Sequence, residues 1–378
     1  TDFVLLEATR KAWADVNGRP KEIKVAEEWI KSEERTVVET VCYSPGKDYL
    51  CDEGFNFWQD DGPAATPGDP EPFLKVYRNA IPDVTIRKLL VESMAWMLQN
   101  RGQRIEKTFV LVGSLQGTGK SLFVRIMGKL LGDSNFADIG VEDFEGNENV
   151  FFAQKEAILI DDADELGRRS EAKLKRYTTT PTHVIKEKYT PQYTVQNYGV
   201  YFLTANEWGM LRLSDQDRRV LLVHFDPEKH YKTGHIWWNE FFNWLDNQGG
   251  YGIIRHFFET LDLKDFNPRY FPPMSEAKKH MVETSRTPEE QWLLALYACP
   301  DDVLPENYQG RSVFSTSELY TLYSGGAYQE LNRGGQTLWG RAIADKFFKA
   351  NGGKPIKHNG KPQPFWKVQN RQKEWGPR

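Results

Sequence analysis

A glycine-rich turn between an apolar run and a helical pattern restricts the fold of this chain more than any other feature. The segment 110–121 reads VLVGSLQGTGKS. Gly117 and Gly119 leave the backbone free to wrap around phosphate groups, and the first amides of a helix attract anions. Lys120 can reach the outer phosphates of a nucleotide, and the Ser121 hydroxyl can ligate magnesium. The segment therefore predicts a strand–turn–helix unit that binds a nucleotide.

The start of this loop departs from the usual spacing. Counting back from Lys120, the first glycine of the usual pattern falls on Ser114, whereas Gly113 lies one residue early. Gly117 and Gly119 remain, so we expect the loop to bind ATP. A glycine-rich turn with an incidental lysine is the alternative, but it does not explain why the strand, turn and helix patterns occur together in the order that a phosphate-binding loop needs. We assign the nucleotide contacts to Ser114, Gln116, Gly117, Thr118, Gly119, Lys120 and Ser121.

Two adjacent carboxylates follow the apolar run 157–160. Neighbouring side chains on an extended backbone point in opposite directions, so Asp161 and Asp162 are expected to have different roles. We assign Asp161, with Ser121, to Mg²⁺ and Asp162 to the general base that polarises the attacking water. Asp164 and the glutamate after it are interpreted as the start of the next helix, where acids favour the positive end of the helix dipole.

A polar side chain and two arginines complete the predicted catalytic set. Asn206 follows another apolar run, where it can orient the attacking water or touch the outer phosphate. A simple turn-forming role for this asparagine is the alternative. Arg218 and Arg219 precede the last apolar run, and a guanidinium suits the charge that develops on a γ-phosphate. An internal salt bridge from Asp217 to Arg219 is the alternative, and one arginine can do each job.

Apolar runs alternate with helical patterns through the centre of the chain, which predicts an α/β fold. Strands that are covered on both faces read as continuous apolar segments, as in a parallel sheet. Helical spacing predicts one helix that begins after Asp83, its expected N-cap, and another over 121–131 that ends at Gly132. Four apolar runs are the predicted strands of the sheet: 109–112, 157–160, 200–203 and 220–223.

A further helix is predicted over residues 235–245, which carry large apolar side chains at helical spacing. We interpret this helix as facing the core, and an aromatic platform for base stacking is the alternative. The side chains on which this depends are Ile236, Trp237, Phe241, Trp244 and Leu245.

The chain divides into five predicted parts around a P-loop core with a parallel sheet. A Pro- and Gly-rich loop marks the first boundary, and helical and strand patterns mark the others. The parts are an N-terminal mixed segment (1–70), a helical collar (71–108), an ATPase core (109–228), a helical lid or connector (229–310) and a basic winged-helix-like domain (311–378).

The C-terminal tail is basic although the whole chain has a formal net charge of −4. Residues 331–378 contain eleven Lys and Arg and two acids, a local charge of +9. Helices over 317–323 and 337–350, followed by a Lys-rich hairpin over 354–368, are typical of a winged-helix module. The second helix would present Arg341, Lys346 and Lys349 to DNA. Solubilising charge is the alternative interpretation.

Composition excludes several classes of protein. A hydrophobic content of 39% and a charged content of 27% are those of a globular chain and argue against disorder or a fibre. Three cysteines are too few and too scattered for a disulfide framework or a zinc site. Without a transmembrane run or a signal segment, we expect no membrane partner and a cytoplasmic location. The first residue is Thr1 and not Met, so we expect a fragment of a longer polypeptide.

The motifs, in this order, resemble those of superfamily 3 helicases, the AAA+ branch found in viral, phage and plasmid replication proteins. The resemblance is greatest to poxvirus-like primase-helicases. Segments 173–180 (KLKRYTTT) and 184–193 (VIKEKYTPQY) are similar to a stretch of that family that usually forms a hairpin pointing into the channel of a ring. Segment 55–58 (FNFW) is similar to a signature upstream of phage primase-helicase motors, including primase-polymerases of the kind known from deep-sea vent phages.

The resemblance implies a homohexameric ring with ATP bound between subunits and Arg218 or Arg219 supplied in trans. It also implies a primase-polymerase part in the same polypeptide and, for a phage protein, a location in the host cytoplasm. Two features depart from the family pattern. Ser114 stands in place of the first loop glycine. Residues 178–180 are threonines where relatives often carry a Gly-rich turn that includes an acid, and this leaves the register of the hairpin open by a residue or two.

The residues of this hairpin also suggest contact with nucleic acid. Alternation from His183 to Lys188 predicts a strand with Lys186 and Lys188 on one face, where both can meet phosphates of one DNA strand. A solvated face is the alternative for these lysines. Tyr189 and Tyr193 either stack on bases or pack the hairpin.

Together these features predict a magnesium-dependent ATPase that moves along single-stranded DNA and unwinds duplex DNA during replication. An ATP-switched assembly or loading module, which binds DNA without unwinding it, is the alternative. A small-molecule kinase would explain neither the paired arginines nor the basic tail.

Overall fold

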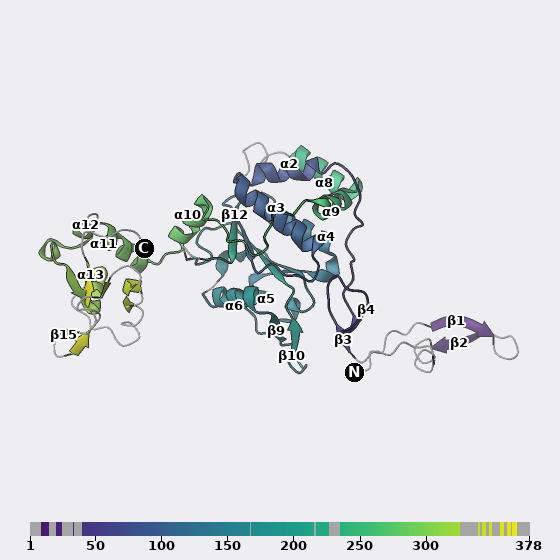
Figure 1. Cartoon of the computed structure of the whole chain (residues 1–378), viewed down its shortest axis with the longest axis horizontal. Coiled ribbons are helices and arrows are strands. Elements are labelled where there is room, and N and C mark those ends of the chain that lie inside the picture. Colours follow the sequence, from purple (N-terminus) through teal and green to yellow (C-terminus); the bar gives the residue numbers. More distant parts are fainter. Residues whose placement is uncertain are drawn as a thin grey trace.

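A computed structural model gives the architecture of the chain (Figure 1). It describes residues 9–14, 20–24, 33, 40–166, 168–214, 217–226 and 235–325, and further on residues 339–340, 342–344, 348–349, 356–358, 361–363 and 365–368. In these ranges no helix combines the length and the apolar character that crossing a lipid bilayer requires.

A five-stranded parallel sheet forms the centre of the structure, with the strand order β12-β6-β11-β8-β7. Each of the four predicted runs lies inside one of these strands, so the α/β prediction is confirmed. The fifth strand, β7, was not predicted, because the exposed Asp138 interrupts its apolar pattern and only Ile139 is buried. The strands are β6 (Thr108–Val112), β7 (Phe136–Ile139), β8 (Ala157–Ile160), β11 (Val200–Ala205) and β12 (Val220–His224).

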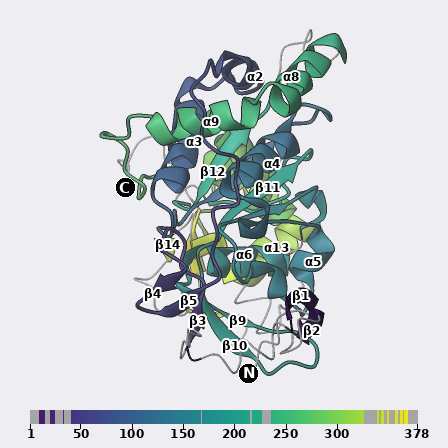
Figure 2. The ribbon, with the colours of Figure 1, turned by 90° about the vertical axis from the view of Figure 1, so that its right-hand side faces the viewer.

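The two faces of the sheet are covered by different helices, because successive side chains of a strand point to opposite faces. In β6, Phe109 and Leu111 pack into one apolar cluster, whereas Val110 and Val112 pack into a second. The first face is covered by α2 (Glu71–Ala80), α3 (Val84–Gln99), α4 (Lys120–Leu131), α8 (His235–Asn247) and α9 (Gly250–Thr260). The second is covered by α5 (Val141–Glu145), α6 (Arg168–Thr179) and α10 (Glu276–Thr284). Figure 2 shows α9 crossing in front of α3 on the first face.

Two of the predicted helix ends are confirmed, the start of α3 and the end of α4. The carboxylate of Asp83 accepts hydrogen bonds from the backbone N–H groups of Thr85 (2.9 Å) and Ile86 (3.0 Å), which confirms it as the N-cap of α3. Gly132 ends α4 with a φ of +103°, a conformation that L side chains rarely adopt. Short 3₁₀ helices lie at η1 (Asp133–Asn135), η2 (Val150–Phe152), η3 (Ala163–Glu165) and η4 (Glu306–Tyr308).

A buried ion pair attaches the N-terminal segment to the core. Nε of Arg101, at the end of α3, donates to Oε2 of Glu156 at 2.9 Å, and both side chains are less than 10% exposed. The Trp58 indole N–H donates to Oε1 of Glu156 at 2.9 Å, and the Arg101 guanidinium lies 5.1 Å from the Trp58 ring centroid. The segment 55–58, quoted above for its resemblance, is therefore anchored beside β8. Four strands lie before this segment and a fifth, β5, overlaps its start: β1 (Thr9–Ala14), β2 (Pro20–Lys24), β3 (Val41–Cys42), β4 (Leu50–Cys51) and β5 (Gly54–Asn56).

The C-terminal part has its own apolar cluster of helices and strands. Its elements are α11 (Pro288–Ala298), α12 (Pro300–Val303), β13 (Val313–Ser315), α13 (Thr316–Ser324), β14 (Phe348–Lys349), β15 (Ile356–His358), β16 (Lys361–Gln363) and β17 (Phe365–Lys367). Leu293 and Leu296 of α11 pack into this cluster with Phe314, Ile343 and Trp366. The cluster thus draws side chains from both sides of residue 310.

The predicted second helix of this part is wrong at its C-terminal end. Residues 339–340 and 342–344 are helical, but 348–349 form β14, which pairs antiparallel with β17. Pairing with a neighbouring strand overrides the helical spacing here. Lys349 therefore lies on a strand, whereas Arg341 and Lys346 lie outside the described residues.

Candidate functional site

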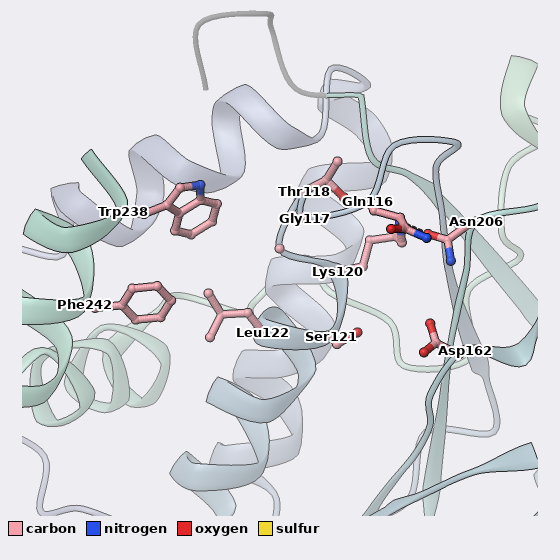
Figure 3. A pocket seen from close by; sticks show the side chains of 11 residues that line it. Gln116, Gly117, Thr118, Lys120, Ser121, Leu122, Asp162, Asn206, Trp238 and Phe242 are labelled. Atoms are coloured by element: carbon pink, nitrogen blue, oxygen red, sulfur yellow. Dashed lines mark hydrogen bonds between the residues drawn. The ribbon is translucent and has the colours of Figure 1, made fainter. Parts of the chain in front are cut away.

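The C-terminal ends of three parallel strands meet at one edge of the sheet. Ala205 of β11 pairs with Val112 of β6, and Leu203 of β11 pairs with Ile160 of β8. This register places the phosphate loop (residues 113–121), the acidic pair and Asn206 next to one another, although they are far apart in the sequence. Figure 3 shows side chains from all three facing one cavity.

The phosphate loop has the open backbone that its sequence predicts. Gly117 and Gly119 have φ angles of +71° and +89°, in the left-handed region that glycine adopts at little cost. No other group lies within 4 Å of the place where a Cβ of Gly117 would stand. The Thr118 hydroxyl is buried and has no hydrogen-bond partner among the described residues. Open amides beside an unsatisfied hydroxyl form a cradle suited to phosphate oxygens.

Lys120 lies across the base of the loop. Its Nζ donates to the carbonyl oxygens of Gly113 (2.9 Å) and Leu115 (3.1 Å) and to Oδ1 of Asn206 (2.9 Å). Burial lowers the pKa of Lys120, and the nearby aspartates oppose this shift. An anion that enters the cavity would therefore give this ammonium group a charged partner in place of neutral carbonyls.

Asp161 is held by hydrogen bonds on both of its carboxylate oxygens. Oδ1 accepts from the Ser121 hydroxyl at 2.6 Å and from the Thr204 hydroxyl, and Oδ2 accepts from Nη2 of Arg125 at 2.7 Å. Burial would raise the pKa of Asp161, but the hydrogen bonds from Ser121 and Thr204 and the charge of Arg125 outweigh it, so the pKa is lowered. Asp161 and Ser121 thus place two oxygen atoms side by side, an arrangement suited to a hard cation such as Mg²⁺.

Asp162 faces a different direction from its neighbour. Its φ of +48° is in the left-handed region, which aspartate tolerates better than most residues. Its backbone N–H donates to the Thr204 hydroxyl at 3.2 Å, and its side chain lines the cavity together with Lys120 and Asn206 (Figure 3). The two adjacent carboxylates therefore lie in different surroundings: Asp161 is held in a hydrogen-bond network, and Asp162 is open to the cavity.

Asp164 belongs to the site, although the sequence placed it only at a helix start. It does lie in the first turn of η3, and its Oδ1 also accepts from the backbone N–H groups of Asn206 (2.7 Å) and Glu207 (2.8 Å). Nδ2 of Asn206 donates to Oδ2 of Asp164 at 3.0 Å. Asp164 thereby orients the amide so that Oδ1 of Asn206 faces Lys120. Only the pairing of β8 with β11 brings these residues together.

Two aromatic side chains of α8 form the other wall of the cavity. Trp238 and Phe242 lie one helical turn apart and line the same space of about 560 Å³ as the phosphate loop. The core-facing interpretation of this helix holds for Phe241 and Leu245, which are buried, whereas the side chains of residues 236 and 237 lie outside those described. The lining residues are Gln116, Gly117, Thr118, Gly119, Lys120, Ser121, Leu122, Asp162, Asn206, Trp238 and Phe242.

Ser114 is close to this cavity without lining it. Its hydroxyl accepts a hydrogen bond from the Trp208 indole N–H at 3.3 Å, and its side chain is exposed. The residue that replaces the usual first glycine therefore contacts Trp208 and is not among the residues that line the cavity.

Arg218 and Arg219 lie at the opposite end of the sheet from the phosphate loop. They precede β12, whose first residue pairs with Thr108, the first residue of β6. Arg219 pairs with Asp217 through Nη2 and Oδ2 at 3.3 Å, so the alternative internal salt bridge is present. Arg218 is exposed. Both arginines line a second cavity of about 920 Å³ that also contains Arg104, Lys107 and Arg269.

The predicted hairpin is present, but its lysines are not on a strand. Strand β9 (Thr182–Ile185) pairs antiparallel with β10 (Tyr193–Gln196), so the strand predicted to reach Lys188 ends three residues earlier. Lys186 and Lys188 instead lie in the connection between the strands. The reason is a competing contact, since the Lys186 backbone N–H donates to Oδ1 of Asn149 at 2.6 Å.

The tip of this hairpin exposes polar and aromatic groups. Tyr189 is fully exposed and has a φ of +62°, and Tyr193 is 39% exposed. Nζ of Lys188 lies 3.4 Å from Oε1 of Glu148, and both side chains are more than 40% exposed. An ion pair this exposed contributes little to stability, so Lys188 can exchange it for another anion.

A buried histidine lies at the base of the hairpin. His183 of β9 is 3% exposed, and its Nε2 is 3.0 Å from the hydroxyl oxygen of Tyr201 on β11. Burial lowers the pKa of His183 to about 4, and the positive charge of Arg104 acts in the same direction. The hairpin is thus attached to the sheet through a buried imidazole, and burial favours the neutral form of this ring.

Comparison with known proteins finds a family model that matches part of the chain and solved structures with a similar fold. Residues 111–219 match a family described as Family of unknown function (DUF5906). No curated protein matches the chain. The apo structure of NrS-1 C terminal region (305-718) is similar with a TM-score of 0.65 and 17% identity, over 93% of this chain and 92% of that chain. The A form apo structure of the same region has a TM-score of 0.63 and 16% identity, with the same coverage of 93% and 92%.

At this level of identity the structural similarity establishes the fold. This chain shares the fold of the NrS-1 C terminal region, and it does so over nearly its whole length. The family match begins in β6 and ends at Arg219, so it includes the phosphate loop, the acidic pair, Asn206 and both arginines.

Replacing His183 with Gln should make the protein less sensitive to acid. Because the pKa of His183 is lower in the folded state, its contribution to the free energy of unfolding is complete above the unfolded pKa near 6.5. This contribution is lost as the pH falls towards the folded pKa near 4. Between pH 7 and pH 5 the wild type should lose about 2 kcal/mol of unfolding free energy that His183→Gln does not lose. Urea unfolding of both proteins at the two pH values measures this. Equal losses would contradict the buried neutral imidazole.

Proposed function

We propose that this chain is the ATP-hydrolysing motor of a superfamily 3 type DNA helicase that moves along single-stranded DNA during replication. One observation carries the proposal: Lys120, Asp162 and Asn206 face one cavity above an open phosphate loop, beside the contact between Ser121 and Asp161. The sequence resemblance given above supports the helicase class, and the fold shared with the NrS-1 C terminal region is consistent with it.

The residues of the cavity fit ATP and Mg²⁺. The unsatisfied Thr118 hydroxyl and the open turn at Gly117 suit phosphate oxygens. Oγ of Ser121 and Oδ1 of Asp161 lie 2.6 Å apart, and oxygen is the ligand that Mg²⁺ prefers. Ser121 would hold the ion directly and Asp161 through water. Bound Mg²⁺ would supply positive charge to the outer phosphate oxygens.

The side chains that line the cavity would then each have a role in ATP hydrolysis. Asp162 takes a proton from the water that attacks the γ-phosphorus, while the bond from that phosphorus to the β–γ bridging oxygen breaks. Asn206, oriented by Asp164, positions the water or the γ-phosphate. Lys120 stabilises the charge that gathers on the β- and γ-phosphates. Asp161 is too fully hydrogen-bonded to act as the base.

Replacing Asp162 with Asn should separate binding from hydrolysis. We expect ATP to bind with nearly wild-type affinity, because the phosphate loop is unchanged, whereas turnover falls by roughly 100- to 10,000-fold through loss of the base. Lys120→Ala should lose binding itself. Calorimetric titration with Mg·ATP and phosphate release measure the two effects. Asp133→Asn, an exposed carboxylate outside the cavity, is the control and should behave as wild type. Loss of ATP binding in Asp162→Asn would show that our division of the carboxylates is wrong.

The hairpin tip is the proposed contact with DNA. Lys186, Lys188 and Tyr189 lie together on an exposed connection, where lysines can meet phosphates and the tyrosine can stack on a base. In a ring of identical subunits, such hairpins would point into the channel. This geometry would couple each cycle of hydrolysis to a step along the strand.

Replacing Lys186 and Lys188 together with Ala should abolish the stimulation of ATP turnover by single-stranded DNA and leave DNA-free turnover unchanged. The slope of log affinity against log salt should become shallower by about 1.4, since each phosphate contact contributes about 0.7 on a single strand. Lys264→Ala is the control, because its side chain is 86% exposed and it is not part of the hairpin of β9 and β10. Unchanged stimulation and salt dependence would instead favour an ATP-switched assembly or loading module.

We also propose that the subunits form a homohexamer in which Arg218 reaches the ATP of a neighbour. Arg219 already pairs with the buried Asp217, whereas no ion pair of Arg218 is found in the described part of the chain. Arg219 would then hold the segment in place while Arg218 acts in trans. The resemblance further suggests a primase-polymerase part in the same polypeptide and, for a phage protein, action in the host cytoplasm.

Mixing two inactive variants tests this arrangement. Lys120→Ala lacks a working phosphate loop and Arg218→Ala lacks the arginine, so neither should hydrolyse ATP alone. In randomly mixed rings about a quarter of the interfaces combine an intact loop with an intact arginine, so turnover should partly return. Mixing Lys120→Ala with Asp162→Asn is the control and should restore nothing, because both changes affect the same side of an interface. No recovery in the first mixture would count against the trans arginine.

A further inference from the structure

The apolar wall of the nucleotide cavity is a pair of stacked rings. Trp238 and Phe242 of α8 have ring centroids 5.8 Å apart and planes inclined by only 26°. Figure 3 shows both rings projecting from α8 towards the phosphate loop and Leu122, across the cavity from Asp162 and Asn206. The cavity therefore has a polar side and an aromatic side.

The rings lie close to the start of α4. A Cβ built on Gly119 would come within 3.2 Å of the Trp238 ring, so a glycine at this position leaves room for the indole. Leu122, in the first turn of α4, lines the same side of the cavity. The aromatic wall thus begins directly beside the amides that would hold the phosphates.

The exposure of Phe242 distinguishes it from the core residues of the same helix. Phe241 and Leu245 are 4% and 1% exposed, whereas Phe242 is 39% exposed and lines the cavity. A large apolar ring left half open in a cavity gains stability when another flat apolar group covers it. Core packing accounts for Phe241 and Leu245 but leaves the position of Phe242 unexplained.

We propose that Trp238 and Phe242 form the platform on which the base of a nucleoside triphosphate stacks. The inference rests on the proposed nucleotide site, because it places the base at the aromatic end when the phosphates occupy the loop. Leu122 and Phe242 offer only carbon, and Trp238 adds a single indole N–H. The platform thus holds the base through its flat face, a feature that all nucleobases share.

In this proposal the two aromatic residues raise the affinity for the nucleotide by contacting its base, and they take no part in binding or hydrolysing the phosphates. Stacking of a base on an aromatic side chain corresponds to roughly 5- to 100-fold in affinity. Loss of a ring should weaken ATP and GTP by the same factor. It should leave inorganic triphosphate, which has no base, unaffected.

Calorimetric titration of the full chain with Mg²⁺ complexes of ATP, GTP and inorganic triphosphate tests the proposal. We expect Trp238→Ala and Phe242→Ala each to lose roughly 5- to 100-fold in affinity for ATP and GTP, with triphosphate affinity unchanged. Trp238→Phe should recover most of the loss. Phe57→Ala is the matched control, because Phe57 is also 39% exposed but lies outside the cavity, and it should bind all three ligands as wild type does.

The possible outcomes separate this inference from the proposed function. Unchanged ATP affinity in both ring variants would overturn the platform while leaving the nucleotide site in place. Equal losses for ATP and triphosphate in both variants would also overturn it, since the rings would then act through the phosphate loop. Failure of the wild type to bind ATP or triphosphate at all would contradict the proposed function itself.

Discussion

The carboxylate of Asp161 joins the elements on which the rest of the candidate site depends. It accepts hydrogen bonds from Ser121 at the start of α4 and from Thr204 near the end of β11, and it pairs with Arg125 one turn along α4. These partners hold its pKa low although burial opposes the charge. The helix after the phosphate loop is thereby fastened to two strands. Because Asp161 makes these structural hydrogen bonds, the adjacent Asp162 is not needed for them and its side chain is open to the cavity.

The parallel sheet also explains why the predicted site is divided between its two ends. The polar groups that face the cavity, in the phosphate loop and at Asp162 and Asn206, come directly after the C-termini of β6, β8 and β11. Arg218 and Arg219 instead precede the N-terminus of β12. A five-residue strand spans roughly 16 Å, so one chain cannot bring these arginines to its own phosphate loop without rebuilding the sheet. We propose that the arginine end of a second copy approaches the loop instead. This is the physical basis for proposing a ring of subunits.

Much of the fold and part of the site could be predicted because local patterns control them. The buried strands read as continuous apolar runs, and Asp83 and Gly132 mark helix ends through backbone geometry that depends on a few neighbouring residues. Other features depend on partners far away in the sequence. β7 is an edge strand with an exposed Asp138, and the strand β9 stops before Lys186 because Asn149 takes up the next backbone N–H. No local pattern contains this information.

The sequence by itself determined that a phosphate loop, an acidic strand end and a polar strand end occur in the order of a nucleotide-binding sheet. Only the tertiary structure decided how these pieces meet. Strand register brings Asp164 to Asn206, and the packing of α8 turns Trp238 and Phe242 towards the loop while Phe241 enters the core. The physical reason is that helical spacing shows which side chains share a face, but the position of the neighbouring elements decides what that face meets.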